Sequence, residues 1–129
     1  MDQELYLSKD TMIVSETDLK GIITYANDDF CKLCGFTKEE LIGKPHNIIR
    51  HPDMPKWAFQ SLWDTIKQNK SWQGIVKNRT KDGDYYWVNA TAYKINKDNG
   101  DQRYVSIRVK PTKDEIVNAT NLYRQKDVI

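Results

Sequence analysis

The apolar positions of this chain change their period about half-way along it. Residues 72–80, 85–95 and 104–110 alternate apolar and polar side chains and are rich in aromatic and β-branched types, which predicts three β-strands. Residues 81–84 and 97–101 separate these segments and carry Gly, Asp and Asn, as hairpin turns do. We therefore expect the second half of the chain to form hairpin-linked antiparallel strands.

The first half begins with two short strand-like segments, residues 12–16 and 22–25. Residues 27–29 can cap a short helix that ends at Gly35, and a Thr-x-x-Glu capping box at residues 37–40 starts a second short helix. This part of the chain is therefore expected to be mainly helical.

The longest helix is expected after Asp53, taken as its N-cap, and Pro55, taken as its first-turn proline. Four apolar residues then recur at helical spacing and predict one buried face: Phe59, Leu62, Trp63 and Ile66. A second capping box at residues 112–115 predicts a terminal helix over residues 115–126.

Together these elements predict an α+β fold. Its five-stranded antiparallel sheet would carry short helices and one longer helix on one face, with a C-terminal helix added. The 129 residues suit a single domain. We divide it into an N-terminal arm (residues 1–11), a core (residues 12–112) and a C-terminal helix or connector (residues 113–129).

Composition excludes several classes of protein. The net charge of +2, from 20 basic and 18 acidic residues, is too balanced for a dedicated nucleic-acid binder. No apolar run approaches the roughly 18 residues of a membrane span, and the first residues do not resemble a signal peptide. Cys31 and Cys34 lie in a helical segment, which favours two ordinary thiols over a redox-active pair. We expect a cytoplasmic domain that does not insert into a membrane.

The order of two strands, helices and three strands resembles that of the PAS domain. Residues 25–28 with Phe30, residues 35–43, and residues 81–83 with 86–87 resemble the family's motifs. More specifically, residues 45–55 and 72–79 are similar to the bacterial aerotaxis-receptor branch. The PAS domain of that branch binds FAD and reports cellular redox state, so the resemblance implies a flavin sensor. The sequence shows no catalytic acid–base pair, so no enzymatic activity is expected.

Small residues on the inner face of the sheet suggest a cavity. If Asn78 points inward, alternation places two sets of residues beside it: Trp72, Gly74 and Val76 on its own strand, and Tyr86, Val88, Ala90 and Ala92 on the next. Gly74, Ala90 and Ala92 are too small to fill the space between sheet and helices. Either large helix residues fill it, or a flat ligand does.

A flavin ring requires aromatic cover and hydrogen-bonding groups at its edge. Trp63 and Trp72 can supply the cover or can be ordinary core residues, and the amide of Asn78 can donate and accept at the edge. In light-sensing flavin PAS domains an asparagine matches Asn78, whereas Val88 replaces a second asparagine. A glutamine on their last strand corresponds to Arg108 or, as the alternative, to Val109. The residues 47–51 lack the cysteine that those sensors use, so a flavin–cysteinyl adduct is not expected.

The loop over residues 50–55 is the most unusual segment, because two prolines stiffen it. Arg50 is a planar cation suited to phosphate oxygens, and His51 can stack on adenine or donate a hydrogen bond. Asp53 can contact the ligand or serve only as a cap, and the loop can be merely solvated. The resemblance implies FAD contacts at Asn27, Arg50, His51, Asp53 and Trp72. The candidate set for cofactor binding is completed by the expected pocket residues: Trp63, Val76, Asn78, Ala90 and Ser106.

Three functions remain open besides the FAD redox sensor that signals to a chemotaxis-type transducer. They are a flavin enzyme, a PAS sensor of haem or another ligand, and a ligand-free interaction module. Haem would have only His46 and His51 as histidine ligands.

The outer face of the sheet carries an apolar set: Ile75, Trp87, Tyr93, Val105, Ile107 and Val109. Such a face is rarely left in water. The N-terminal arm or the terminal helix can cover it. It can also meet a HAMP or methyl-accepting transducer, or a second copy of the chain in a homodimer.

Overall fold

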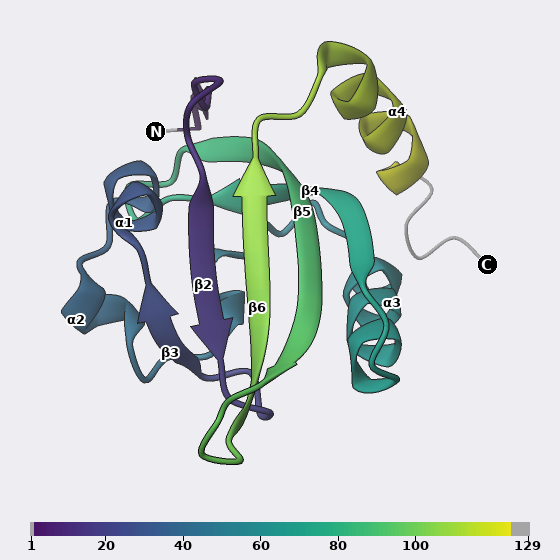
Figure 1. Ribbon diagram of the computed structural model, residues 1–129. Coiled ribbons are helices and arrows are strands. Elements are labelled where there is room, and N and C mark those ends of the chain that lie inside the picture. Colours follow the sequence, from purple (N-terminus) through teal and green to yellow (C-terminus); the bar gives the residue numbers. More distant parts are fainter. Residues whose placement is uncertain (1, 125–129) are drawn as a thin grey trace.

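The computed structural model describes residues 2–124 and shows one curled sheet with helices packed on it (Figure 1). The elements follow the predicted order. They are β1 (Glu4–Leu5), β2 (Ile13–Thr17), β3 (Ile23–Ala26), α1 (Asp28–Cys34), α2 (Lys38–Leu41), the 3₁₀ turn η1 (His46–Ile49), α3 (Lys56–Lys67), β4 (Trp72–Arg79), β5 (Tyr85–Asn96), β6 (Gln102–Val109) and α4 (Lys113–Tyr123).

The predicted five-stranded antiparallel sheet is present, in the order β4-β5-β6-β2-β3. The expected arm adds a sixth strand, which corrects the prediction: β1 pairs in parallel with β5, with Glu4 opposite Tyr85 and Leu5 opposite Tyr86. β6 pairs only with the later part of β5, from Asn89 onward, so β1 covers backbone groups that β6 leaves open.

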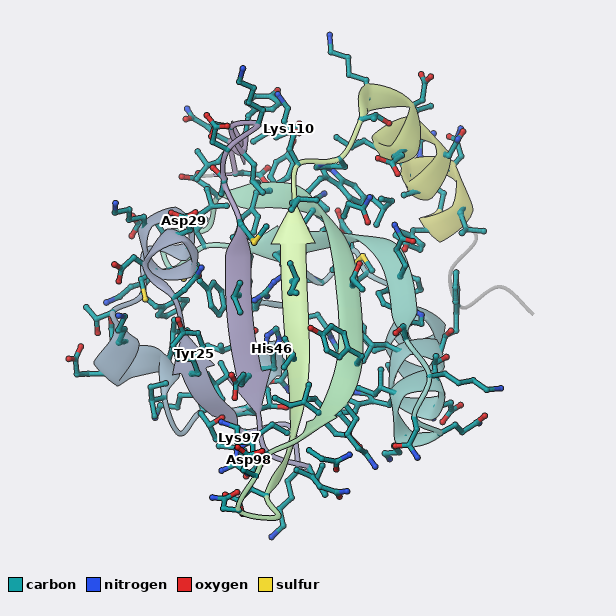
Figure 2. The ribbon with its side chains drawn as sticks, viewed as in Figure 1. Tyr25, Asp29, His46, Lys97, Asp98 and Lys110 are labelled. Atoms are coloured by element: carbon teal, nitrogen blue, oxygen red, sulfur yellow. The ribbon has the colours of Figure 1, made fainter. Side chains whose placement is uncertain are left out.

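The helices α1, α2 and α3 lie on one side of the sheet, with η1 between them in sequence, while α4 lies apart from them at the upper right of Figure 1. Figure 2 shows His46 near the centre of the fold behind β2 and β6, and Lys97 and Asp98 at the turn between β5 and β6. The space between these helices and the inner face of the sheet contains most of the core.

The predicted caps are confirmed at three helices. Asn27 caps α1, and both capping boxes, at Thr37 and Thr112, have their reciprocal hydrogen bonds. The expectation for Asp53 is wrong. Helix α3 begins at Lys56 with Pro55 in an extended conformation before it, and no side chain caps it. The carboxylate of Asp53 instead accepts from Lys77 Nζ at 2.8 Å. Helix α4 is described to Tyr123, and the last predicted residues, 125 and 126, lie outside the described part of the chain.

Helix α4 covers part of the outer face of the sheet. The terminal helix was one of the two segments expected to cover this face, the other being the N-terminal arm. The Tyr123 ring stacks on Trp87, with centroids 6.4 Å apart, and its hydroxyl donates to the Ile75 carbonyl at 2.5 Å. Trp57 of α3 meets Tyr123 edge-on at 5.7 Å. Tyr123 therefore joins α4 both to the sheet and to α3.

The other residues predicted for the outer face differ in how far they are exposed. Val109 is 36% exposed, and Tyr93 and Ile107 are half-buried. Val105 was expected to face away from the cavity, but it is one of the residues that line it. Its neighbours Tyr104 and Ser106 also line the cavity, because β6 runs along the cavity wall there.

The docking of α4 can be tested at Tyr123. Tyr123→Phe removes one hydrogen bond and should lower the free energy of unfolding by about 1 kcal/mol. Tyr123→Ala also removes the buried ring and should cost about 3 kcal/mol. Urea unfolding measures both changes. Leu122, which is 52% exposed, provides the control, because Leu122→Ala should change stability by less than about 0.5 kcal/mol. A Tyr123→Ala variant as stable as the parent would show that α4 does not dock here in solution.

Candidate functional site

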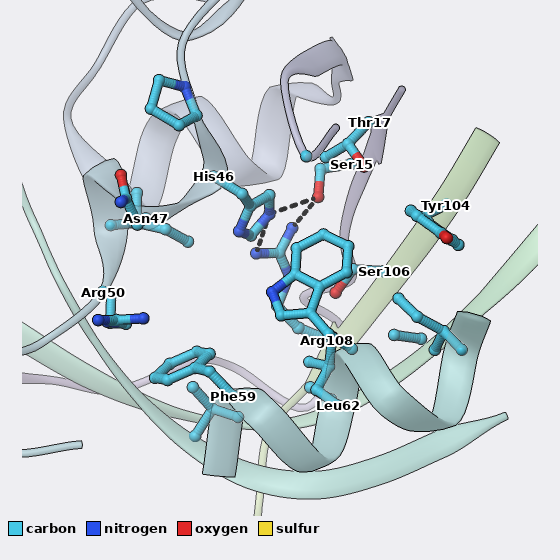
Figure 3. Close-up of a pocket in the computed structure, with 18 of the residues that line it drawn as sticks. Ser15, Thr17, His46, Asn47, Arg50, Phe59, Leu62, Tyr104, Ser106 and Arg108 are labelled. Carbon is cyan, nitrogen blue, oxygen red and sulfur yellow. Dashed lines mark hydrogen bonds between the residues drawn. The ribbon is translucent and has the colours of Figure 1, made fainter. Parts of the chain in front are cut away.

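A cavity of about 320 Å³ lies between the inner face of the sheet and the helices (Figure 3). Strands β2, β4, β5 and β6 supply one wall, α3 supplies a second, and the segment around η1 supplies a third. Its apolar lining comes mainly from Ile49, Phe59, Leu62, Trp63, Ile66, Val76, Ala90 and Ala92. The volume lies at the small end of the range of about 300–1,000 Å³ that is typical of small-molecule sites.

One part of the cavity wall is polar and is built around Arg108. Its Nη2 donates to Ser15 Oγ at 2.7 Å, and its Nη1 lies 3.4 Å from His46 Nε2 (Figure 3). Ser15 Oγ is also 3.0 Å from the same His46 nitrogen. The antiparallel pairing of β2 with β6 brings Ser15 close to Arg108, and η1 supplies His46 from the helical side.

The guanidinium of Arg108 is a buried cation. The residue is 2% exposed, and its guanidinium lies over the Phe30 ring at 4.5 Å from the centroid. Burial lowers the pKa of Arg108 to about 10, so the group is still charged at neutral pH. The cavity lining described in residues 2–124 includes two further basic residues, Lys20 and Arg50, and no Asp or Glu. The cavity therefore has a positive potential.

His46 is neutral in the folded protein. Burial, followed by the charge of Arg108, lowers the pKa of His46 to about 3. A guanidinium can only donate hydrogen bonds, so its contact with Nε2 requires a lone pair there. The tautomer protonated on Nδ1 fits this arrangement.

Six of the ten candidate residues line this cavity: Arg50, Trp63, Val76, Asn78, Ala90 and Ser106. Asn78 is 4% exposed and points inward, as predicted. Arg50 lies on the opposite side of the cavity from Ser106, with its guanidinium 4.4 Å from the centroid of the Phe59 ring (Figure 3). A backbone bridge joins Arg50 to Asn78, so the loop runs along the free edge of β4.

Trp72 is not among the residues that line the cavity. Its indole lies against Gly74, where a Cβ atom would come within 2.3 Å of the ring, and its Nε1 donates to Ser61 Oγ at 3.3 Å. The residue lines a separate groove between α3, β4 and α4. The space that Gly74 was expected to leave for a ligand is therefore filled by Trp72, while Ala90 and Ala92 do line the cavity.

His51 and Asp53 also lie outside the cavity lining. Asp53 pairs with Lys77, and the His51 ring meets Tyr85 edge-on at 6.0 Å. Lys77 and Tyr85 alternate with the inward-facing residues of their strands, so these contacts are on the outer side of the sheet. Met54 Sδ accepts from the backbone N–H of Lys77 at 3.4 Å. The loop thus wraps around the edge of β4, with Arg50 on the cavity side.

Asn27 has a structural role away from the cavity. Its Oδ1 accepts from Phe30 N at 3.1 Å, as a helix cap, and from Val14 N at 3.0 Å. Its Nδ2 donates to the Met12 carbonyl at 2.9 Å. One side chain therefore joins β2 to the start of α1.

Sequence reasoning left Ser15, His46, Tyr104 and Arg108 out of the candidate set, although all four line the cavity. A signal for Arg108 was present. It alternates in phase with Ser106, a member of the candidate set, so the two side chains share one face of their strand. No comparable pattern identified Ser15 or His46, because their roles come from contacts between distant segments.

Within residues 2–124, no group of three or more His, Cys, Asp or Glu side chains is placed to hold a metal ion. No helix in that part of the chain is long and apolar enough to span a membrane.

The structural role of Asn27 predicts a specific loss of stability. Asn27→Ala removes a cap and two further hydrogen bonds, so the free energy of unfolding should fall by about 2 kcal/mol. Asn27→Asp keeps both acceptor contacts and should lose about half as much. Chemical denaturation measures both. An Asn27→Ala variant with parental stability but weakened ligand binding would instead indicate a direct role in binding.

The neutral state of His46 predicts how stability depends on pH. The usual pKa of histidine is 6.5, so the unfolded chain takes up a proton below that pH, whereas folded His46 takes one up only near pH 3. Stability is therefore lost as pH falls from 6.5 toward 3, by up to about 1.4 kcal/mol per pH unit. Between pH 7 and 5 the parent should lose about 2 kcal/mol more than His46→Gln. The matched control is His51→Gln, which retains His46. Its stability should therefore fall between pH 7 and 5 almost as much as that of the parent. Equal losses in the parent and His46→Gln would contradict the neutral assignment.

Known proteins share the family and the fold of this chain. The sequence profile of a family described as the PAS fold matches residues 23–115. The aerotaxis receptor of Escherichia coli (strain K12) is 48% identical over 122 residues, which is 95% of this chain and 24% of the receptor. The nitrogen fixation regulatory protein of Klebsiella pneumoniae is 31% identical over 78 residues, 60% of this chain and 16% of that protein. The chain thus spans about a quarter or less of the length of these relatives.

Solved structures have the same fold. A PAS domain from Colwellia psychrerythraea superposes with a TM-score of 0.69 at 25% identity, over 80% of this chain and 88% of that one. A light-oxygen-voltage domain, from a study with a flavin analogue, gives 0.70 at 19% identity over 89% and 87% of the two chains. The two sequence relatives are named as a receptor and as a regulatory protein, and neither name is that of an enzyme. The chain belongs to the PAS family and resembles the PAS domain of aerotaxis receptors.

Proposed function

We propose that this chain is an FAD-binding sensor domain that reports the redox state of its flavin to a chemotaxis-type transducer. The observation that carries the proposal is the cavity, which combines apolar walls with a buried cationic group. The 48% identity with an aerotaxis receptor supports this function, since aerotaxis is movement in response to oxygen. The fold shared with a light-oxygen-voltage domain is compatible with a flavin.

The lining residues fit the ring system of a flavin. The short side chains of Ala90 and Ala92 leave room for a flat ring against the sheet. Leu62 and Ile66 of α3 line the opposite, helical side of the cavity. The amide of Asn78 has both a donor and an acceptor for the edge of the ring. A cavity of about 320 Å³ suits the ring rather than the entire dinucleotide. The pyrophosphate would then lie toward Arg50, whose planar cation matches phosphate oxygens.

When bound, FAD would supply one- and two-electron redox chemistry. The protein would hold the ring in a low-dielectric site, orient its edge through Asn78, and limit its contact with water. His51 and Asp53 hold the loop against Tyr85 and Lys77, and this keeps Arg50 beside the cavity. Direct flavin contacts of His51, Asp53, Asn27 and Trp72 remain predictions.

The signal would leave through the sheet. β6 lines the cavity with Ser106 and Arg108, and it carries Ile107 and Val109 on its other face. A change in the hydrogen bonds at the ring edge could therefore alter the outer surface, where we propose that a HAMP or methyl-accepting transducer docks. A homodimer through the same surface is the competing partner, and we place both interactions in the cytoplasm.

The purified protein tests the cofactor directly. It should be yellow, and denaturation should release a flavin that chromatographs as FAD. Release of FMN or haem, or a colourless protein that cannot be reconstituted with FAD, would contradict the proposal.

Asn78 tests the site. Asn78→Ala leaves a partner group on the ring without its hydrogen bond, so FAD affinity should fall about ten- to hundredfold without unfolding the domain. Gln73→Ala, on the exposed outer face of the same strand, is the matched control and should bind FAD like the parent. Unchanged affinity in Asn78→Ala would show that the ring does not meet this strand.

A further inference from the structure

We propose that Arg108 makes the cavity selective for a ligand that carries negative charge, and that it therefore binds reduced flavin more tightly than oxidised flavin. The inference rests on the proposed function, because the ligand is taken to be a flavin. It assigns Arg108 the role of a specificity-determining residue that controls how easily the bound ring is reduced.

The first observation is that Arg108 is buried without an opposite charge. Its contacts are a hydroxyl, a neutral imidazole and an aromatic ring, from Ser15, His46 and Phe30. No carboxylate in the described part of the chain pairs with it. Its Nε is also buried without a hydrogen-bond partner. A buried cation is stable only when it is well paired, so this site is incomplete as it stands.

The second observation concerns the groups that surround Arg108. The charged residues that line the cavity with it, Lys20 and Arg50, are also cationic. Cys34 and Tyr86 lie near the guanidinium, and burial raises the pKa of both, so each is neutral at physiological pH. Within the described residues, the cavity thus presents positive charge and no negative charge, and its occupant is the group that can supply the missing anion.

Reduction of a flavin creates such an anion. An external reductant delivers two electrons, one proton is taken up at N5, and the negative charge spreads over N1 and the C2 carbonyl. The oxidised ring is neutral and offers the same atoms only as acceptors. A guanidinium donates two parallel hydrogen bonds and carries a full charge, so it favours the reduced ring over the oxidised ring. In a site with little water this preference is larger than it would be in solution.

The experiment compares the affinity of each variant for oxidised FAD and for FAD reduced anaerobically with dithionite. Arg108→Gln keeps a hydrogen-bond donor but removes the charge. Its ratio of reduced to oxidised affinity should fall at least about tenfold, which lowers the two-electron potential by about 30 mV. Arg108→Lys keeps the charge and should retain most of the preference. Arg103→Gln, on the same strand but paired with Asp101 at the surface, should leave the ratio unchanged.

A second readout uses the ligand-free protein. If Arg108 serves the ligand, removing its unpaired charge should leave the melting temperature of ligand-free Arg108→Gln equal to or above that of the parent. A structural arginine would instead lower it. The proposal is overturned if Arg108→Gln keeps the parental affinity ratio, if Arg108→Lys loses it as fully as Arg108→Gln, or if the ligand-free Arg108→Gln variant is destabilised or fails to fold. A parent that binds no flavin in either state refutes the proposed function itself.

Discussion

The uncompensated charge of the buried Arg108 guanidinium is the constraint on which the chemical character of the cavity depends. The guanidinium connects β6 with Ser15 of β2 and His46 of η1, and it lies over Phe30 of α1. Four segments that are distant in sequence therefore share one charged group. Because neutral partners satisfy a cation only partly, these contacts leave the charge of Arg108 available to an occupant of the cavity.

The strand β4 separates the cavity from the surface through contacts on both of its faces. Asn78 and Val76 line the cavity, whereas Lys77 holds Asp53 and the Ile75 carbonyl receives the Tyr123 hydroxyl. The loop that contains Arg50 wraps around the free edge of this strand. A displacement of β4 would thus change its contacts with the cavity, with the loop and with α4 at the same time.

Helix α3 likewise contacts both the cavity and α4. Its inward residues line the cavity, and Trp57 at its start meets Tyr123 of α4. Trp72 packs between these regions, against Gly74 and next to Ser61 of α3. The aromatic residues that were expected to cover a ligand are thus divided. Trp63 faces the cavity, and Trp72 fills the space between α3 and the sheet.

The sequence by itself determined the order of elements, the helix caps at Asn27, Thr37 and Thr112, and the inward set that contains Asn78 and Ala90. These features depend on local periodicity and on hydrogen bonds between near neighbours, which a sequence displays directly. Only the tertiary structure decided that β1 joins the sheet, that Asp53 pairs with Lys77 instead of capping α3, and that Trp72 occupies the space over Gly74. It alone also brought Ser15, His46 and Arg108 together. Each of these outcomes depends on which distant segments meet, and on which competing contact has the lower free energy, and neither is encoded in spacing along the chain.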